Sequence, residues 1–234
     1  MTEDTVGLPG NAEEMAAFFD DRVEVYERHM REHVDDFDEF YGSAVAAIPG
    51  ALKLPRILDL GVGTGLELDR LFARFPEAHV TGIDISQGML DALTSKSRSW
   101  RTRVRTIHGS FLDMDLGRSA YDVALSVMAL HHWIPAVKLE LYRRIRHALV
   151  PGGAFVNADY VSSNEESSRR LTEYSAAGYD NRHTRHIDLP LPIEVERRLL
   201  SEAGFASAQV AFERDHCATI IAMTTSSDPC PTAA

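Results

Sequence analysis

The sequence predicts an α/β protein with a doubly wound, mostly parallel sheet, an antiparallel hairpin strand near the C-terminus and a helical N-terminal cap. Between residues 56 and 160, short apolar runs alternate with amphipathic segments of about ten residues. This alternation is typical of right-handed βαβ units, in which helices cover both faces of a parallel sheet. From residue 15 to 48, apolar side chains instead recur every three or four positions, as in amphipathic helices.

Each element is expected from its own pattern and from the residues that end it. Apolar runs predict strands at 56–60, 79–84, 104–108, 121–127 and 154–160. Amphipathic segments predict helices between them at 66–75, 86–96 and 136–149, and further helices at 164–177 and 193–203. Two alternating runs, 207–213 and 216–224, share a short link and predict the hairpin. Near the N-terminus, Asp35 and Asp36 are expected to cap a second helix, which Pro49-Gly50 ends.

Three regions follow from these patterns. Residues 1–50 are expected to form the helical cap, with a mobile arm at 1–10. Residues 51–225 form the main α/β domain, which contains a helical insertion at about 162–190. The last residues, 226–234, are rich in Pro, Ser and Thr and are expected to be disordered.

Composition favours an ordinary globular protein of the cytoplasm. The 234 residues are 44% hydrophobic and 25% charged, and no apolar run reaches the roughly 20 residues that cross a bilayer. The acidic N-terminus lacks the basic and apolar regions of a secretory signal. Cys217 and Cys230 are expected to be reduced, and their positions suggest no metal site, so no metal is expected.

The net charge of −11 disfavours nucleic acid as a partner, because binding to phosphate backbones depends on clustered Lys and Arg. The short basic cluster at 96–105 is interpreted as a helix end and a strand entry. A small-molecule substrate is expected instead, with no membrane association. The chain is expected to be a monomer or a homodimer.

A glycine loop predicts a ligand site at the end of the first strand. Gly61, Gly63 and Gly65 allow a sharp turn and close approach to a ligand, and the following helix N-terminus suits a carboxylate. Asp84 ends the second strand, where a carboxylate can accept hydrogen bonds from both ribose hydroxyls. A dinucleotide fingerprint needs glycine at position 66, but this chain has Leu66, which disfavours NAD.

Five ordered segments resemble the successive motifs of class I S-adenosylmethionine (SAM)-dependent methyltransferases, which have a Rossmann-like sheet. They are ILDLGVGTG (57–65), VTGID (80–84), HGSFLD (108–113), YDVALSVMALHHW (121–133) and LVPGGAFV (149–156). The resemblance implies that SAM is bound and S-adenosylhomocysteine (SAH) released. It places the methionine end at the three glycines, the ribose at Asp84 and the adenine at Met89. The adjoining residues expected in the site are Asp59, Ile85 and Val127, the last beside the sulfonium.

The third motif departs from the family pattern. Many members carry an aspartate after the glycine to bind the adenine amino group, but this chain has Ser110, with Asp113 three residues later. Phe111 offers a backbone amide and a ring edge. Whether Ser110 or Asp113 binds the adenine stays open.

Candidate catalytic residues lie at the ends of the fourth and fifth strands. Methyl transfer depends mainly on positioning the acceptor, so a general base is optional. His131 is the first candidate, because its ordinary pKa is near neutrality; the alternative is that His131 and the adjoining His132 only cap or pack the next helix. Tyr160 is the second candidate.

The N-terminal segment 18–30 resembles the lid of small-molecule methyltransferases, which places Tyr26 at the cofactor carboxylate; a purely core position is the alternative. Arg22 or Arg185 would suit an anionic acceptor. His183, Arg185 and His186 either meet a substrate or form a solvated loop. The expected function is methyl transfer to O, N or C of a small molecule. The alternatives are a tRNA or macromolecule modifier, a synthase that elaborates the cofactor's methyl group, and a SAM-binding protein without methylating activity.

Overall fold

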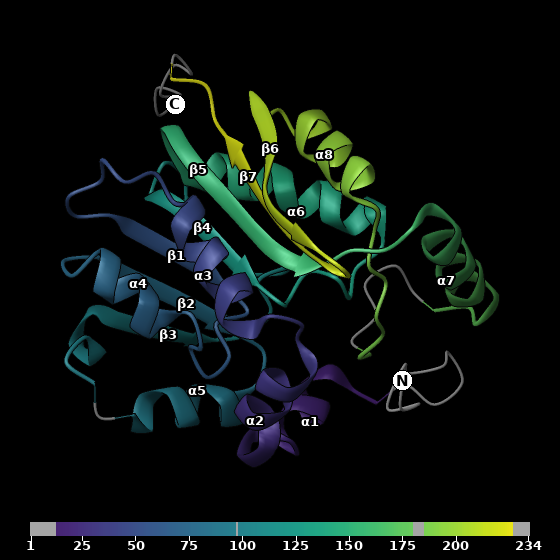
Figure 1. The fold of residues 1–234 in the computed structure, drawn as a ribbon, viewed down its shortest axis with the longest axis horizontal. Coiled ribbons are helices and arrows are strands. Elements are labelled where there is room, and N and C mark those ends of the chain that lie inside the picture. Colours follow the sequence, from purple (N-terminus) through teal and green to yellow (C-terminus); the bar gives the residue numbers. More distant parts are fainter. Residues whose placement is uncertain (1–12, 97, 180–184, 227–234) are drawn as a thin grey trace.

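The computed structural model describes residues 13–96, 98–179 and 185–226. Within them, seven strands form one sheet in the order β3-β2-β1-β4-β5-β7-β6 (Figure 1). The expected arm at 1–10, most of the expected tail at 226–234, Cys230 and His183 lie outside the described residues.

The first five strands are parallel and confirm the expected doubly wound sheet. They are β1 (Arg56–Leu60), β2 (His79–Asp84), β3 (Val104–His108), β4 (Tyr121–Val127) and β5 (Leu149–Tyr160). The chain runs outward from β1 to β3 and then returns to β4 on the other side of β1. Open parallel sheets bind ligands at such a reversal, beyond the carboxyl ends of the strands.

The C-terminal hairpin is also confirmed. Strand β7 (Cys217–Met223) runs antiparallel to β5 and to β6 (Ser207–Arg214), so β6 forms the sheet edge. The turn between the two strands contains Asp215 with a φ of 49°.

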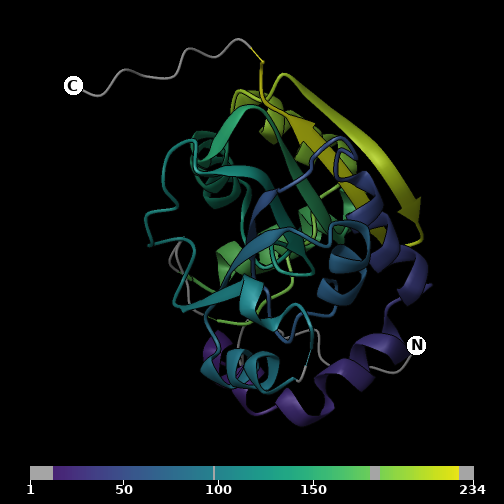
Figure 2. The same cartoon turned by 90° about the vertical axis from the view of Figure 1, so that its left-hand side faces the viewer.

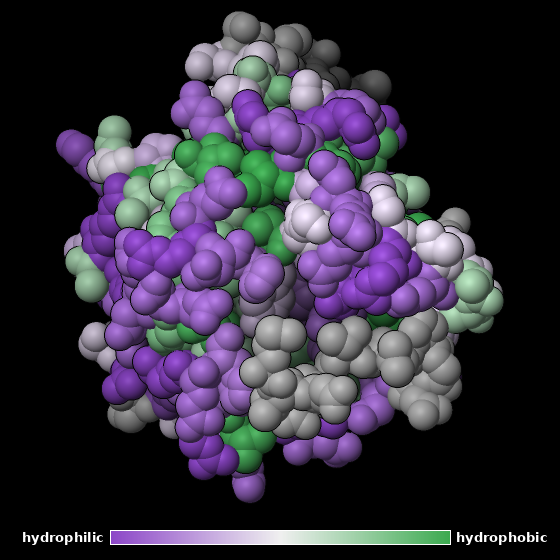
Figure 3. Space-filling model, turned by 45° about the vertical axis from the view of Figure 1, so that its right-hand side comes forward, coloured by the Kyte–Doolittle hydropathy of each residue, from purple (hydrophilic) through white to green (hydrophobic). Residues whose placement is uncertain are grey.

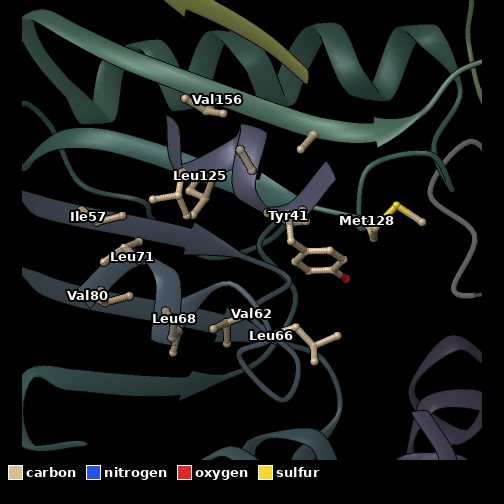
Figure 4. Close-up of a cluster of buried hydrophobic side chains, with 14 of the residues drawn as sticks. Tyr41, Ile57, Val62, Leu66, Leu68, Leu71, Val80, Leu125, Met128 and Val156 are labelled. Carbon is tan, nitrogen blue, oxygen red and sulfur yellow. The ribbon is translucent and has the colours of Figure 1, made fainter. Parts of the chain in front are cut away.

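Helices cover both faces of the sheet. One face carries α3 (Phe37–Ala47), α4 (Leu68–Arg74) and α5 (Gln87–Ser95), which share a core with alternate side chains of β1, β4 and β5. Figure 4 shows part of this core, with Ile57, Leu125 and Val156 on the strands and Leu68 and Leu71 on α4. The other face carries α6 (Pro135–Ala148) and α8 (Ile193–Glu202). A 3-10 turn at Arg101–Arg103 leads into β3.

The N-terminal segment differs from the expectation of two helices. It forms three helices, α1 (Met15–Asp20), α2 (Val23–His33) and α3. Asp36 is the residue directly before α3. Asp36 has a left-handed φ of 47° and its side chain caps nothing, so the expected cap there is wrong. Its carboxylate instead pairs with Arg214 on β6.

Helices α1 and α2 lie beyond the strand ends (Figures 1 and 2), and only Met15 and Met30 of these helices are buried in the two hydrophobic cores. In contrast, α3 packs on β5 and β7 with Phe40, Tyr41 and Ala44 buried. The part that can act as a lid is therefore α1 and α2; the division of the chain at residue 50 stays a prediction. Helix α7 (Asn164–Ala176) lies to the side of the same end of the sheet (Figure 1).

None of the described helices has the length and apolar character needed to cross a bilayer. The face shown in Figure 3 is mostly hydrophilic, with small apolar patches, as the composition leads one to expect.

Candidate functional site

The glycine loop between β1 and α4 has the backbone that its sequence predicts. Gly61, Gly63 and Gly65 have φ values of 76°, 49° and 72°, in the left-handed region that favours glycine. A Cβ on Gly61 would lie 2.4 Å from the Cβ of Ala129, in the loop after β4. Glycine at this position therefore allows the loops after β1 and β4 to approach closely.

Asp84, at the end of β2, is joined to the glycine loop. Its Oδ2 accepts a hydrogen bond from the amide of Gly63 at 2.7 Å, and its Oδ1 accepts one from the amide of Ser86 at 2.9 Å. The side chain is 7% exposed, and burial raises the pKa of its carboxyl group. The carboxylate is thus held at the ligand-facing end of the sheet with a fixed orientation.

A cavity lies against this loop, and we call it the glycine-loop cavity. Seven residues that the sequence predicts for the cofactor site line it: Tyr26, Gly61, Gly63, Asp84, Ile85, Met89 and Phe111. The other lining residues, which are Met15, Phe19, Met128, Ala129 and His132, were not predicted for the cofactor site. The lid helix α1 and the loop after β4 therefore complete a wall that the motifs predict only in part.

Some expected site residues do not line this cavity. Gly65 packs inward, where a Cβ would lie 2.7 Å from Leu93 of α5. Val127 is buried at the end of β4, and the next residue, Met128, lines the cavity instead. Met128 has a left-handed φ of 55°, a backbone conformation that residues other than glycine rarely adopt.

Of the residues predicted after β3, only one lines the glycine-loop cavity. Phe111 lines the cavity, whereas Ser110 Oγ accepts a hydrogen bond from the amide of Leu112 at 3.2 Å within its own turn. Asp113 is exposed. The residue that binds the adenine amino group stays a prediction with both alternatives open.

Asp59, on β1, belongs to a buried acidic pair with Glu67. Asp59 is 1% exposed and Glu67 is 4% exposed. Burial raises the pKa of both carboxyl groups, that of Glu67 to about 7. Among the described residues, Asp59 Oδ2 and Glu67 Oε1 have no hydrogen-bond partner. Glu67 was not predicted, although a glutamate between Leu66 and Leu68 is an unusual residue for an apolar helix start.

A larger cavity of about 350 Å³ adjoins the first, and we call it the second cavity. The two share the side chains of Phe19, Tyr26, Met128 and His132. The lid side of the second cavity combines the apolar Phe18, Val25 and Met30 with polar side chains, which are Arg22, His29 and His33. A polar part of its wall is formed by His131, Tyr160, His186 and Asp188.

His131 lies between two carboxylates. Its Nδ1 is 2.5 Å from Asp159 Oδ1, and its Nε2 is 3.5 Å from Asp188 Oδ1. Burial opposes the charged imidazole, but Asp159 and Asp188 outweigh burial and raise the His131 pKa to about 9. A protonated imidazole cannot accept a proton at neutral pH, so this environment disfavours the expected role as a general base. Asp159 and Asp188 were not predicted, because only the folded chain brings β5 and the segment before α8 to this loop.

The other polar residues here have different environments. The ring of Tyr160 lies edge-on to that of His131, with centroids 5.2 Å apart. Burial raises the pKa of the Tyr160 hydroxyl. His186 stacks on Phe18 at 3.6 Å, and burial with the nearby His132 lowers its pKa to about 3. His186 therefore belongs to the cavity wall, whereas Arg185 is exposed and lies 3.5 Å from Glu14.

Comparisons with known proteins agree with this site. A family model described as a methyltransferase domain matches residues 57–153, from β1 into β5. The chain is 28% identical over 180 residues to the sterol 24-C-methyltransferase erg-4 of Neurospora crassa, covering 74% of this chain and 43% of that one. It is 24% identical over 223 residues to the carboxy-S-adenosyl-L-methionine synthase of Helicobacter hepaticus, covering 89% and 92%. It thus spans less than half of the sterol enzyme but nearly all of the synthase.

Solved structures share the fold. Human N-acetylserotonin methyltransferase in complex with SAM matches with a TM-score of 0.66 and 20% identity, over 92% of this chain and 60% of that one. The 1,6-didemethyltoxoflavin-N1-methyltransferase of Burkholderia thailandensis, with bound SAH, matches with a TM-score of 0.62 and 20% identity, over 90% and 88%. The ordered motifs, the sheet order and these matches agree with the expected family: residues 57–153 form a methyltransferase domain, and the chain has the fold of the class I SAM-dependent methyltransferases.

Proposed function

We propose that this protein transfers the methyl group of SAM to a small molecule that binds in the second cavity. The observation that carries the proposal is the wall shared by the two cavities, formed by Phe19, Tyr26, Met128 and His132. A cofactor along the glycine loop would place its reactive end toward this wall. A molecule in the second cavity would face it from the other side.

The residues around the glycine-loop cavity fit SAM. Gly61 leaves room for close approach of a ligand, and the rigid carboxylate of Asp84 suits the two ribose hydroxyls. Met89 and Phe111 offer apolar surfaces for the adenine, and Tyr26 closes the cavity from the lid. Bound SAM supplies a methyl group already activated on a sulfonium, so the chain has chiefly to align the acceptor and exclude water.

The second cavity indicates the kind of acceptor. Its volume of about 350 Å³ suits a compact metabolite, not a nucleic acid or a protein surface. The apolar side chains of the lid, Phe18, Val25 and Met30, would contact a hydrocarbon or aromatic body. The polar wall, with His131 and Tyr160, would contact the hydroxyl, amine or activated carbon that receives the methyl group. We propose these two residues as the ones nearest the reacting atom.

Arg22 is a poor partner for an anionic acceptor. Although Arg22 lines the second cavity, both of its terminal nitrogens lie 3.1 Å from the carboxylate of Glu13. Its guanidinium also lies over the ring of Phe18 at 3.8 Å. An uncharged acceptor therefore suits the described wall better.

A second candidate function follows from the match to carboxy-S-adenosyl-L-methionine synthase over 92% of that protein. A synthase would instead move a carboxyl group from a donor in the extract onto the methyl group of SAM, and it would form no methylated product. Mass spectrometry of the nucleoside released from the protein after incubation with SAM and a metabolite extract distinguishes the two. SAH indicates methyl transfer, and a product heavier than SAM by a carboxyl group indicates the synthase.

The proposed function is tested by a screen of metabolites with methyl-labelled SAM and the full chain. We expect label in a small uncharged product together with one equivalent of SAH. Label in RNA or protein, with salt-sensitive retention on RNA, would instead support a macromolecular acceptor and contradict the proposal.

The lid provides a further prediction. Asp20 Oδ1, at the end of α1, accepts hydrogen bonds from Ser86 Oγ at 2.5 Å and from the amide of Gly88 at 2.9 Å. These bonds fix the lid to the start of α5, beside Asp84. Hydrogen bonds to a charged group contribute roughly 1.5–3 kcal/mol each, so Asp20→Ala is expected to speed SAH dissociation about tenfold or more. Stopped-flow displacement measures this rate.

The matched control is Asp21→Ala, which removes the neighbouring exposed carboxylate. Asp21→Ala is expected to leave the SAH dissociation rate within about twofold, because surface substitutions away from such contacts have small effects. Equal rates for wild type and Asp20→Ala would show that α1 does not act as a lid on this cavity.

A further inference from the structure

The polar wall of the second cavity holds three donor groups that point at one another. His131 and His132 come from the loop after β4, and Asp188 comes from the segment before α8. One ligand atom from each lies within 4.8 Å of the others. All three side chains also line the second cavity, so anything bound between them is open to the acceptor.

The distances among these groups are those of ligands around one ion. Asp188 Oδ1 lies 3.2 Å from His132 Nδ1 and 3.5 Å from His131 Nε2. Two ligand atoms that bind one tetrahedral zinc ion at about 2.1 Å are themselves about 3.4 Å apart. The contacts of Asp188 Oδ1 with the two imidazoles do not have hydrogen-bond geometry. Within the described part of the chain, Asp188 Oδ1 and His132 Nε2 are buried without a hydrogen-bond partner. Buried polar atoms of this kind are rare and call for a ligand.

A second carboxylate orients His131. Asp159 Oδ1 lies 2.5 Å from His131 Nδ1, which leaves Nε2 facing Asp188. Asp159 is itself fixed, because its Oδ2 accepts a hydrogen bond from the amide of Leu130 at 2.8 Å. Histidines that bind metals usually donate their other ring N–H to a carboxylate or a carbonyl in this way. His132 Nδ1 also lies 3.2 Å from the carbonyl of Ile187, so binding of an ion at Nδ1 would replace this contact.

We propose that His131, His132 and Asp188 bind one divalent transition-metal ion in the wall of the acceptor cavity. Two imidazoles and one carboxylate suit zinc, iron(II), cobalt or manganese, whereas calcium and magnesium prefer oxygen ligands alone. Three protein ligands leave at least one position of the ion open toward the cavity. The two carboxylates, Asp159 and Asp188, offset the charge of the ion.

The ion gives the proposed function a more specific acceptor, and this part rests on that proposal. A hydroxyl or carbonyl oxygen bound at the open position would be held at a fixed place beside Met128 and His132, which line both cavities. A hydroxyl bound to such an ion also loses its proton to solvent more readily. The acceptor class is therefore an oxygen-bearing molecule that can bind a metal.

The test uses cobalt(II) as the probe, added to the full chain after chelation and dialysis. We expect one equivalent to bind, with a visible absorption spectrum of histidine-nitrogen coordination that saturates at that ratio. Asp188→Asn and His132→Gln are each expected to weaken binding at least a hundredfold. Asp159→Asn removes no ligand and is expected to weaken it about 10- to 100-fold.

The matched control is His79→Gln, an exposed histidine at the start of β2; it should bind cobalt as the wild type does. Far-UV circular dichroism of each variant checks folding, and the wild-type titration needs no variant. Absence of a saturable one-to-one site in the wild type would overturn the proposal, as would unchanged binding in folded Asp188→Asn and His132→Gln.

Calorimetry with SAH on the same metal-free protein separates the two proposals. Cobalt binding without SAH binding would support the metal site and contradict the methyltransferase function. SAH binding without a cobalt site would contradict the metal site alone.

Discussion

Asp84→Ala is expected to weaken SAM binding about a hundredfold or more. Asp84 is buried, and amides of Gly63 and Ser86 fix its carboxylate at the end of β2. We propose that this carboxylate accepts both ribose hydroxyls, and hydrogen bonds to a charged group contribute roughly 1.5–3 kcal/mol each. Losing two of them corresponds to about a hundredfold or more in the dissociation constant. Isothermal titration calorimetry with SAM measures this dissociation constant for the wild type and the variant.

The control for this prediction is Asp91→Ala on α5. Asp91 is an exposed acid whose side chain accepts a hydrogen bond from Gln87 at 2.7 Å on the same helix. The Asp91→Ala substitution also removes one negative charge, from the helix that follows Asp84. It is expected to change SAM binding by less than about twofold. Thermal unfolding of both variants without ligand shows whether the loop itself has been disturbed. A folded Asp84→Ala protein with wild-type affinity would place the cofactor elsewhere.

Lys138→Met is expected to have the largest effect on stability. Lys138 on α6 is fully buried and pairs with Glu196 on α8, which also accepts a hydrogen bond from Tyr142 Oη at 2.6 Å. Removing the ammonium leaves the carboxylate buried without its counter-charge, which costs roughly 3–5 kcal/mol. Urea unfolding followed by circular dichroism measures the loss.

Two further variants test this explanation. Lys138→Met combined with Glu196→Gln removes both charges and keeps an acceptor for Tyr142, so the free energy of unfolding should recover most of its loss. Arg198→Met breaks the pair with Glu202 on the solvent side of α8, where both side chains are about half exposed; it is expected to cost less than about 1 kcal/mol. A single variant Lys138→Met as stable as wild type would show that this pair does not join α6 to α8.

The order of the elements could be predicted because strands and helices of this fold have local signals. The central strands β1 and β4 are largely buried apolar runs, and the helices between the strands have an apolar stripe. The N-terminal segment was harder, since a continuous helical period from 15 to 48 hides two breaks. One break is at Asp36, which has a left-handed backbone and pairs with Arg214, 178 residues away; no local sequence pattern marks this break.

In the candidate site, too, residues in local motifs could be predicted, whereas residues brought together only by the fold could not. The glycine loop and Asp84 are short-range signals, and the structure brings both to one cavity. The partners of His131 could not be predicted: Asp159 lies on a neighbouring strand, and Asp188 comes from a segment without a regular period. Their effect on His131 is large, because two carboxylates raise its pKa to about 9. A histidine chosen from the sequence for its ordinary pKa therefore has a different pKa in the folded protein.

The central claim is that a methyl donor and its acceptor meet at the wall shared by the two cavities. A crystal structure of the full chain with SAH tests this most directly. We expect the ribose at Asp84, the adenine between Met89 and Phe111, and the sulfur facing Met128 and His132, toward the second cavity. SAH bound outside the glycine-loop cavity, or with its sulfur turned away from the second cavity, would contradict the account.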